Sequence, residues 1–276
     1  MQSVESSRIN ESCDLAIGER LDVLKDVLCV RWLLTTESTN DDVKARIAKE
    51  KQGRGFVRIA DIQSRGKGTH GRIWQAPKAS LLLTVGVPID YPIAQAHGLT
   101  LAIGVRVVEL LRRYNSAVKL KWPNDIWVED RKVCGISCET SMSADRRLYL
   151  VVGIGINIAL DEQVQNVAAA SGYRPGALFR ECPGKESLTK MRLDLAARLI
   201  ENCREEILSF SPARMEKIRA QWQELDAMAE RAVKFTTPDG NVFEGFVQGI
   251  DAFGRLRLSC GNRIHTFVDG SLRPLT

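Results

Sequence analysis

Seven short apolar runs between residues 30 and 158 have the lengths and residue types of β-strands. They cover residues 30–34, 57–60, 81–87, 118–122, 126–129, 133–139 and 148–158. Helix signals interrupt them irregularly: hydroxyls and acids suited to an N-terminus follow the first run, Pro92 opens an apolar periodic segment, and helical periodicity returns at 188–210 and 212–225. This order predicts an α+β fold in which helices cover a mixed β-sheet.

From about residue 232 the pattern changes to short strand-like runs at close spacing. A Pro238-Asp239-Gly240 turn separates the first two of these runs, and no helical segment follows. Such a series predicts a small β-barrel. We therefore expect a short N-terminal leader and helix at 1–29, the sheet-containing domain at 30–229, and the barrel at 230–276.

The charged residues and the cysteines restrict the class of protein. Lys and Arg number 39 against 34 Asp and Glu, and the net charge of +5 permits anionic ligands without requiring nucleic acid. The seven cysteines are odd in number and none forms a CxxC pair, which argues against a disulfide framework or a zinc ribbon. No signal-peptide pattern is present, and no apolar run reaches the ~18 residues of a membrane span. We expect a cytoplasmic protein without a membrane segment.

The loop at residues 63–74 is the most unusual segment of the chain. Glycines that expose backbone N–H groups alternate there with basic side chains that suit an anion: Gly66, Lys67, Gly68, His70, Gly71 and Arg72. A solvated surface loop is the alternative. The loop lacks the Walker A spacing, and although it satisfies GxGxxG, residues 72–77 cannot open the helix that a dinucleotide-binding turn requires.

Two further strings could contact a ligand. Lys121-Trp122-Pro123-Asn124-Asp125 ends a strand at a proline-directed turn, where Lys121 is either an exposed basic residue or the partner of a negative substrate group. In Gly153-Ile154-Gly155-Ile156-Asn157, two glycines inside a strand allow close approach of a ligand or another backbone, or else mark a β-bulge.

Taken together, these strings resemble the biotin protein ligase family, in a short form without the N-terminal DNA-binding domain. The resemblance covers nearly everything after residue 30. It runs through Ser38-Thr39-Asn40, the loop at 63–74, the KWPND string at 121–125, residues 132–139, the GIGIN string at 153–157, and weaker matches at 249–251, 254–256 and 271–273.

The resemblance implies a two-step reaction and an SH3-like form for the C-terminal barrel. Biotin and ATP, with Mg²⁺, give biotinoyl-5′-AMP and pyrophosphate, and the ε-amine of a lysine on a biotin carboxyl carrier protein of acetyl-CoA carboxylase, or of a related carboxylase, then attacks the adenylate. A fixed cation must reduce the repulsion between the biotin carboxylate and the α-phosphate, and Lys121 matches the family's lysine in that role. Arg72 is implied as the second catalytic residue, and no residue is implied as a dedicated metal ligand.

The resemblance also implies the binding residues. For biotin they are Ser38, Thr39, Asn40, Gln63, Gly66, Lys67, Gly68, Thr69, Lys121, Gly135 and Gly153. For ATP and the adenylate they are His70, Arg72, Trp74, Asn124, Asn157 and Arg273, with Trp74 stacked on adenine and Asn157 at its polar edge.

The sequence departs from the family at two places. The commonest family loop reads GRGRxGR, whereas this chain has Lys67 and Thr69 in place of the arginines. We predict that biotinoyl-AMP is released faster than from an arginine-bearing relative, and stopped-flow release no faster than that of a Thr69→Arg variant would contradict this. Only about thirty residues precede the match, so we expect no sequence-specific nucleic-acid binding and no repressor role.

Alternatives remain open at this point. A lipoyl or octanoyl ligase or transferase would share the fold, although the WPND spelling argues against it. A nucleic-acid-binding module would use the basic loop, Trp74 as a stacking platform and the terminal barrel, and it predicts salt-dependent affinity for polynucleotide without pyrophosphate release. An edge strand of the sheet leaves a homodimer open.

Overall fold

The computed structural model describes residues 9–68, 73–162, 164 and 174–275. Its residue contacts divide the chain into two compact units. The first unit comprises Met1–Asp90 and Arg131–Leu208, and the second comprises Tyr91–Asp130 and Ser209–Thr276. Each unit is therefore assembled from two separate stretches of sequence.

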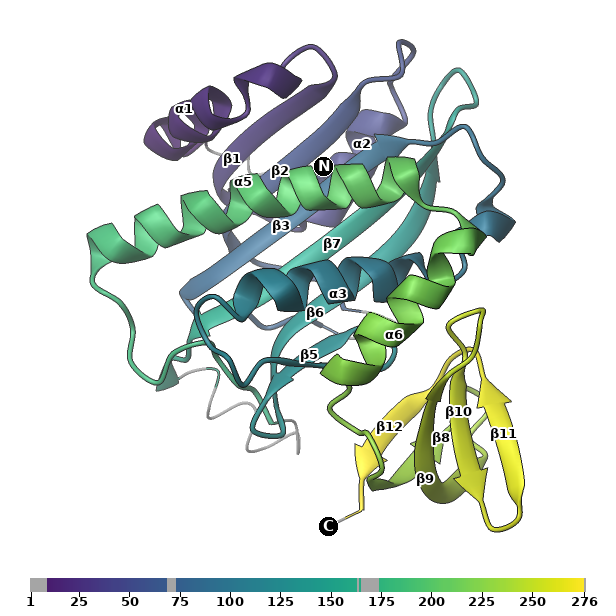
Figure 1. The fold of residues 1–276 in the computed structure, drawn as a ribbon. Coiled ribbons are helices and arrows are strands. Elements are labelled where there is room, and N and C mark those ends of the chain that lie inside the picture. The colour runs from purple at the N-terminus through teal and green to yellow at the C-terminus, as the bar shows by residue number, and fades with distance from the viewer. Residues whose placement is uncertain (1–8, 69–72, 163, 165–173, 276) are drawn as a thin grey trace. The chain divides into compact units, whose positions relative to one another are not determined.

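In the described residues of the first unit, five strands lie in the order β1-β2-β3-β7-β6 (Figure 1). β1 and β2 pair in parallel and the remaining neighbours are antiparallel, so the expected mixed sheet is confirmed. The elements of this unit are α1 (Glu11–Arg20), η1 (Asp22–Leu24), β1 (Leu28–Thr36), α2 (Thr39–Ile47), β2 (Gly55–Gln63), β3 (Ala79–Pro88), β6 (Arg131–Met142), β7 (Leu148–Ala159) and α5 (Lys185–Ser209).

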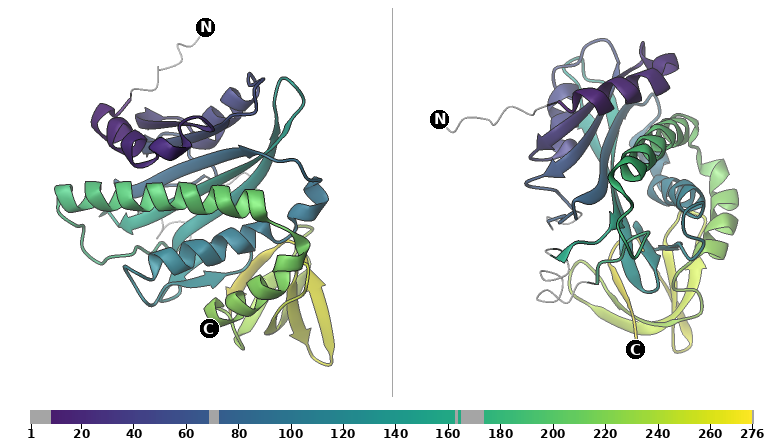
Figure 2. Two further views of the ribbon diagram at one scale, coloured as in Figure 1. Left: turned by 45° about the horizontal axis from the view of Figure 1, so that its top comes forward. Right: turned by 90° about the vertical axis from the view of Figure 1, so that its left-hand side faces the viewer.

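Helices lie on both faces of this sheet. The two views of Figure 2, together with Figure 1, place α5 along one face and the short α2 on the other. Ser38 caps α2 by accepting a hydrogen bond from the Asp41 N–H, and Asp41 and Asp42 occupy the first turn, as the sequence predicts. α2 is thereby fixed at its N-terminal end, which adjoins the candidate site described below.

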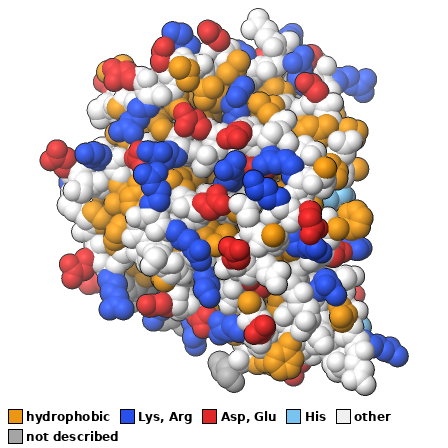
Figure 3. All heavy atoms as spheres, in the orientation of Figure 1, with side chains coloured by type: hydrophobic (Ala, Val, Ile, Leu, Met, Phe, Trp, Pro, Cys, Tyr) orange, Lys and Arg blue, Asp and Glu red, His pale blue; other side chains and the backbone are white. Residues whose placement is uncertain are grey.

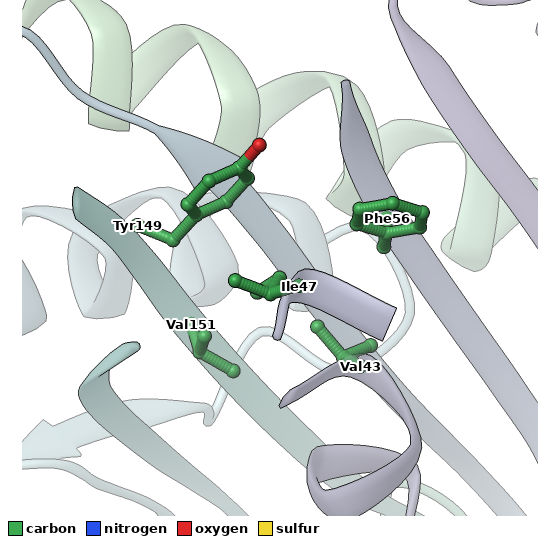
Figure 4. Close-up of a cluster of buried hydrophobic side chains, with 5 residues drawn as sticks. All are labelled: Val43, Ile47, Phe56, Tyr149 and Val151. Carbon is green, nitrogen blue, oxygen red and sulfur yellow. The ribbon is translucent and has the colours of Figure 1, made fainter. Parts of the chain in front are cut away.

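The C-terminal half of α2 is held by an apolar cluster (Figure 4). Val43 and Ile47, four residues apart on the inward face of α2, pack with Phe56 of β2 and with Tyr149 and Val151 of β7. The Tyr149 hydroxyl donates to the Arg54 carbonyl, and burial raises the pKa of this tyrosine to about 12, so it remains a neutral donor. The cluster anchors α2 on the sheet.

The second unit combines a hairpin, two helices and a five-stranded sheet. The C-terminal sheet has the order β11-β10-β9-β8-β12, and every pair in it is antiparallel. The elements are η3 (Ile93–Ala96), α3 (Leu99–Leu111), β4 (Lys119–Lys121), β5 (Asp125–Val128), η4 (Pro212–Arg214), α6 (Met215–Leu225), β8 (Ala232–Thr236), β9 (Val242–Ile250), β10 (Leu256–Cys260), β11 (Arg263–Phe267) and β12 (Ser271–Pro274). The short C-terminal strands are confirmed, while their closure into an SH3-like barrel stays a prediction.

Trp122 joins the two stretches of the second unit. Its indole is 1% exposed, its Nε1–H donates to the Gly254 carbonyl at 3.0 Å, and its ring centroid lies 6.1 Å from that of Phe235. The predicted domain boundaries at 29/30 and 229/230 stay a prediction. What the contacts show is that residues 91–130 cluster with the C-terminal stretch.

Three local expectations are corrected or completed. Pro92 has an extended backbone and precedes only the short η3, so the long helix begins at Leu99, after Gly98 has turned the chain with φ +87°. The β3–β7 and β6–β7 ladders keep a continuous register through Gly153 and Gly155, which excludes a β-bulge there. All seven cysteines are free thiols, and no helix in the described ranges combines the length and hydropathy of a membrane span.

Candidate functional site

One face of the first unit's sheet carries the candidate site. Because side chains alternate along a strand, Val151, Gly153, Gly155 and Asn157 of β7 share one face. Val151 lies under α2 in the apolar cluster, and the next two positions have no side chain. The face is therefore apolar at one end, open in the middle and polar at the other end.

The N-terminus of α2 brings the first predicted biotin-binding residues together with the end of β2. The Gln63 Oε1 atom accepts hydrogen bonds from the Thr39 backbone N–H at 2.7 Å and from the Thr39 hydroxyl at 2.9 Å. Ser38 and Thr39 are buried, at 2% and 4% exposed. The side chains of Ser38, Thr39 and Gln63, called the polar group below, are thus held rigidly on the sheet face by the start of α2 and the end of β2.

Asn40 extends this polar group across the sheet. Its Nδ2 donates to the Ser137 hydroxyl at 3.3 Å and to Glu139 at 3.1 Å, and its Oδ1 lies 2.6 Å from the Thr84 hydroxyl. Gly153 is directly opposite both Thr84 and Ser137 in the ladders. A Cβ atom on Gly153 would lie 2.5 Å from Asn40 Oδ1, so the amide occupies space that only glycine leaves free.

The glycine loop is described only at its two ends. The Trp74 N–H donates to the Gly66 carbonyl at 2.8 Å, Lys67 and Ile73 form an antiparallel bridge, and the Lys67 ammonium pairs with Asp41 at 2.7 Å. Gly68 lies within the described residues, whereas Thr69, His70, Gly71 and Arg72 lie outside them. The predicted roles of Thr69, His70 and Arg72 therefore stay predictions.

The Trp74 indole packs on Gly155 of β7 and Gly135 of β6, which are directly opposite each other in the sheet. Cβ atoms on Gly155 and Gly135 would lie 2.6 Å and 3.0 Å from indole atoms, and the Lys132 ammonium lies 5.3 Å from the ring centroid. The Trp74 Nε1 atom is buried and has no hydrogen-bond partner among the described residues. The indole thus has an unused donor in a shielded place.

Asn157 lies one step further along the same face. Its Nδ2 donates to the Gly176 carbonyl at 3.0 Å, and the residue is 1% exposed. Its Oδ1 atom has no hydrogen-bond partner in the described part of the chain. A buried acceptor without a donor is costly, and it indicates a place where a ligand donor would be stabilised.

Lys121 and Asn124 lie in the second unit, on the β4–β5 hairpin. The Lys121 ammonium lies 3.4 Å from the Asp125 carboxylate across the hairpin and 4.8 Å from the centroid of the Trp127 ring. Its side chain is 9% exposed, so the alternative of an exposed basic residue is wrong. Arg273, also in this unit, is an exposed residue of β12 paired with Lys234. The meeting of Lys121 with the sheet face of the first unit stays a prediction.

Several polar residues of this face were not predicted as site residues. They are Thr84, Lys132, Ser137 and Glu139. One signal was available in the sequence, because Thr84 is the single polar residue within the apolar run at 81–87. Ser137 and Glu139 alternate with apolar residues in β6, and that pattern alone reads as an ordinary half-exposed strand.

Figure 3 shows how charged side chains are distributed on one face of the molecule, the face that α5 covers in Figure 1. On the face shown in Figure 3, Lys and Arg side chains are interspersed with Asp and Glu side chains and do not form one basic patch. Nucleic-acid surfaces concentrate Lys and Arg along one face or groove.

Comparison with known proteins finds matches over nearly the whole chain. Residues 32–157 match the model of the biotin/lipoate A/B protein ligase family, and residues 230–271 match the biotin protein ligase C-terminal domain. The bifunctional ligase/repressor BirA of Salmonella typhimurium is 31% identical over 264 residues, which are 95% of this chain and 79% of the relative. The biotin–[acetyl-CoA-carboxylase] ligase of Mycobacterium tuberculosis is 30% identical over 234 residues, covering 83% and 82%.

Solved structures share the fold. The biotin protein ligase of Aquifex aeolicus in complex with biotin and ATP has a TM-score of 0.65 at 22% identity, covering 89% of this chain and 99% of that one. The biotin acetyl coenzyme A carboxylase synthetase of Helicobacter pylori has a TM-score of 0.56 at 19% identity, covering 86% and 98%.

Proposed function

This chain belongs to the biotin protein ligase family, and from that membership we propose that it attaches biotin to a lysine of a biotin carboxyl carrier protein. The first step forms biotinoyl-5′-AMP and pyrophosphate from biotin and ATP. The second step transfers the biotinoyl group to the lysine amine and releases AMP. The similarity to biotin ligases at about 30% identity over most of both chains carries this proposal.

The polar group at the start of α2 suits the head group of biotin. A cyclic urea presents two N–H donors and a carbonyl acceptor, and the side chains of Thr39 and Gln63 offer oxygen and amide groups from rigid positions. Both are held by hydrogen bonds within the protein, which reduces the ordering needed on binding. Ser38, Asn40 and Gly153 complete this part of the proposed biotin site.

The face beyond Gly153 suits the nucleotide. Two buried polar atoms lack partners there among the described residues, the acceptor Asn157 Oδ1 and the donor Trp74 Nε1, and an adenine ring carries both N–H donors and ring-nitrogen acceptors. Trp74 also supplies an aromatic surface on the glycine pair Gly135 and Gly155. The Mg²⁺ ion would enter with ATP, and Asn124, His70, Arg72 and Arg273 complete the proposed nucleotide contacts.

The proposed role of Lys121 follows from electrostatics. A carboxylate and a phosphate repel each other as the acyl-phosphate bond forms, and a cation held between them lowers the energy of that transition state more than that of the separated reactants. The largely buried position of the Lys121 ammonium strengthens such an interaction, because fewer water molecules screen it. Arg72 is proposed to share this charge.

The test of the function is a transfer assay. The purified chain is incubated with Mg-ATP, labelled biotin and a biotin carboxyl carrier domain, and label on the acceptor lysine is measured together with released pyrophosphate. We expect pyrophosphate release that depends on biotin, and transfer only to a carrier that retains its lysine. Labelled lipoate in a parallel reaction tests the same-fold alternative: transfer of lipoate in preference to biotin would overturn the proposal.

The acceptor protein, the location in the cell and the oligomeric state are further proposals. The Mycobacterium tuberculosis relative is named for acetyl-CoA carboxylase, so the carrier protein of that carboxylase is the first acceptor to test. A cytoplasmic location, an absence of sequence-specific nucleic-acid binding and a homodimer stay predictions.

A further inference from the structure

Four side-chain oxygen atoms form a continuous line of contacts on the site face of the first unit. Thr39 Oγ1 lies 2.9 Å from Gln63 Oε1 and 2.8 Å from Thr84 Oγ1, and Thr84 Oγ1 lies 2.6 Å from Asn40 Oδ1. Thr39, Thr84 and Asn40 are buried. Each of these distances is short enough for a hydrogen bond, and each hydrogen bond that forms requires one proton.

Both ends of this line can only accept. Gln63 Oε1 is fixed as an acceptor because the Thr39 backbone N–H donates to it at 2.7 Å. The amide of Asn40 is fixed in the same sense by Glu139, since an ionised carboxylate has no proton to give and must face the Asn40 NH₂ group. The Lys44 ammonium pairs with the other oxygen of the same carboxylate. Asn40 therefore presents its oxygen to Thr84.

The number of available protons makes Thr39 Oγ1 a hydrogen-bond acceptor toward a ligand. Three contacts share only the two hydroxyl protons of Thr39 and Thr84. Because Thr84 gives its proton to Asn40, Thr39 can donate to Gln63 or to Thr84 but not to both. With either acceptor, the Thr39 hydroxyl proton is used within the protein, and Thr39 Oγ1 presents a lone pair to a ligand.

We propose that Glu139 is a positioning residue for the ligand head group. Through Asn40 and Thr84 it fixes the direction of the hydrogen bonds that reach Thr39, and so keeps Thr39 Oγ1 an acceptor. Such a position favours a ring that carries N–H donors, as a cyclic urea does, over a dithiolane ring, which has none. The inference rests on the proposed function and assigns part of the preference for biotin over lipoate to Glu139 and Thr84, which are not among the proposed biotin contacts.

The test is a reciprocal exchange of hydrogen-bonding groups. Glu139→Gln gives position 139 an amide that can donate, so Asn40 is free to turn over and offer its NH₂ group to Thr84. Thr84 then donates to Thr39 and supplies the missing proton, and Thr39 becomes a weaker acceptor. Asn40→Asp places a second carboxylate against Glu139. We expect each single change to weaken biotin binding by roughly tenfold or more.

The double variant distinguishes a positioning role from a merely structural one. With Asn40→Asp and Glu139→Gln together, the amide introduced at position 139 would donate to one oxygen of the carboxylate introduced at position 40. The other oxygen of that carboxylate would accept from Thr84, so the original direction is restored. We expect biotin affinity and Tm to recover to within about threefold and a few degrees of the starting protein, with the KM for ATP unchanged throughout. Glu186→Gln, an exposed charge change on α5, is the matched control.

The outcomes separate the inference from the proposed function. Additive losses in the double variant, in both biotin affinity and Tm, would overturn the inference while leaving a protein that still binds biotin. If the starting protein does not bind biotin at all, the proposed function is overturned. Recovery of Tm in the double variant would in that case still support the hydrogen-bond arrangement. Recovery of Tm without recovery of affinity would overturn the assigned effect on the ligand.

Discussion

At the scale of single residues, the Lys121 ammonium is the group on which the proposed chemistry most depends. Asp125 and the Trp127 ring enclose it within the second unit, in a position where few water molecules reach it. Both neighbours hold the ammonium in place, Asp125 by an ion pair and Trp127 by a cation–π contact. The lysine is thus positioned before a ligand binds.

Replacing Lys121 by Ala should lower the rate of adenylate formation by about 10²–10³-fold, the loss typical of removing one preorganised charge contact in a shielded site. Biotin-dependent exchange of pyrophosphate into ATP measures this step. Lys119→Ala, at an exposed position of the same strand, is the control and should keep the rate within about twofold. An exchange rate in Lys121→Ala equal to that control would contradict the assigned role.

Asp226 predicts a pH dependence of stability. Burial raises the pKa of this carboxyl to about 7, against the opposing effects of the Met228 N–H and the positive charge of Lys119. Because the folded-state pKa lies above the unfolded-state value, the folded state favours the protonated acid. The stabilisation is present at low pH and is lost as the pH rises through about 7.

Asp226→Asn removes this titration. We expect the variant to have a Tm several degrees above that of the starting protein at pH 8 and close to it at pH 5, by thermal unfolding followed with circular dichroism. A Tm difference that is the same at both pH values would show that Asp226 does not titrate in this range.

At the scale of elements, β7 shows how one strand divides a sheet face between core and site. Its alternating residues change from Val151 through two glycines to Asn157, and each step meets a different partner: α2, the Asn40 amide, the Trp74 indole and the Gly176 carbonyl. The ladders on both sides remain regular at Gly153 and Gly155, so these glycines provide space for side chains and do not break the strand.

Gly155→Ala therefore tests the nucleotide end of the site. The added Cβ would lie 2.6–2.9 Å from three indole atoms of Trp74, so the ring must shift while the ladder is unaffected. We expect the KM for ATP to rise about tenfold to hundredfold, with biotin affinity little changed. Gly18→Ala in α1, where a Cβ meets nothing within 4 Å, is the matched control, and equal ATP kinetics in the two variants would refute the assignment.

At the scale of the whole molecule, the C-terminal sheet is tied to a stretch that precedes it by more than a hundred residues. Trp122 donates to Gly254 and packs near Phe235, and residues 91–130 form one compact unit with the C-terminal stretch. A chain of fewer than about fifty residues has little core of its own. A domain boundary at residue 230 would thus separate the C-terminal strands from Trp122, which contributes to their packing.

We predict that a fragment of residues 230–276 alone does not fold cooperatively. Its amide proton spectrum should have the narrow dispersion of an unfolded chain, because the indole that fills part of its core is absent. A dispersed spectrum with a sigmoidal thermal transition would show instead that this stretch is an independent domain.

The sequence by itself determined the strands, the capped start of α2 and the strings that identify the family, because these depend on local periodicity, capping chemistry and residues close together in the chain. It also indicated Thr39, Asn40, Gln63 and Gly153 as neighbours in function. Only the tertiary structure decided that Thr84, Ser137 and Glu139 contact Asn40, and that the Trp74 indole packs against Gly155. The physical reason is register: hydrogen bonds between strands far apart in sequence decide which side chains share a row, and local patterns do not record that pairing.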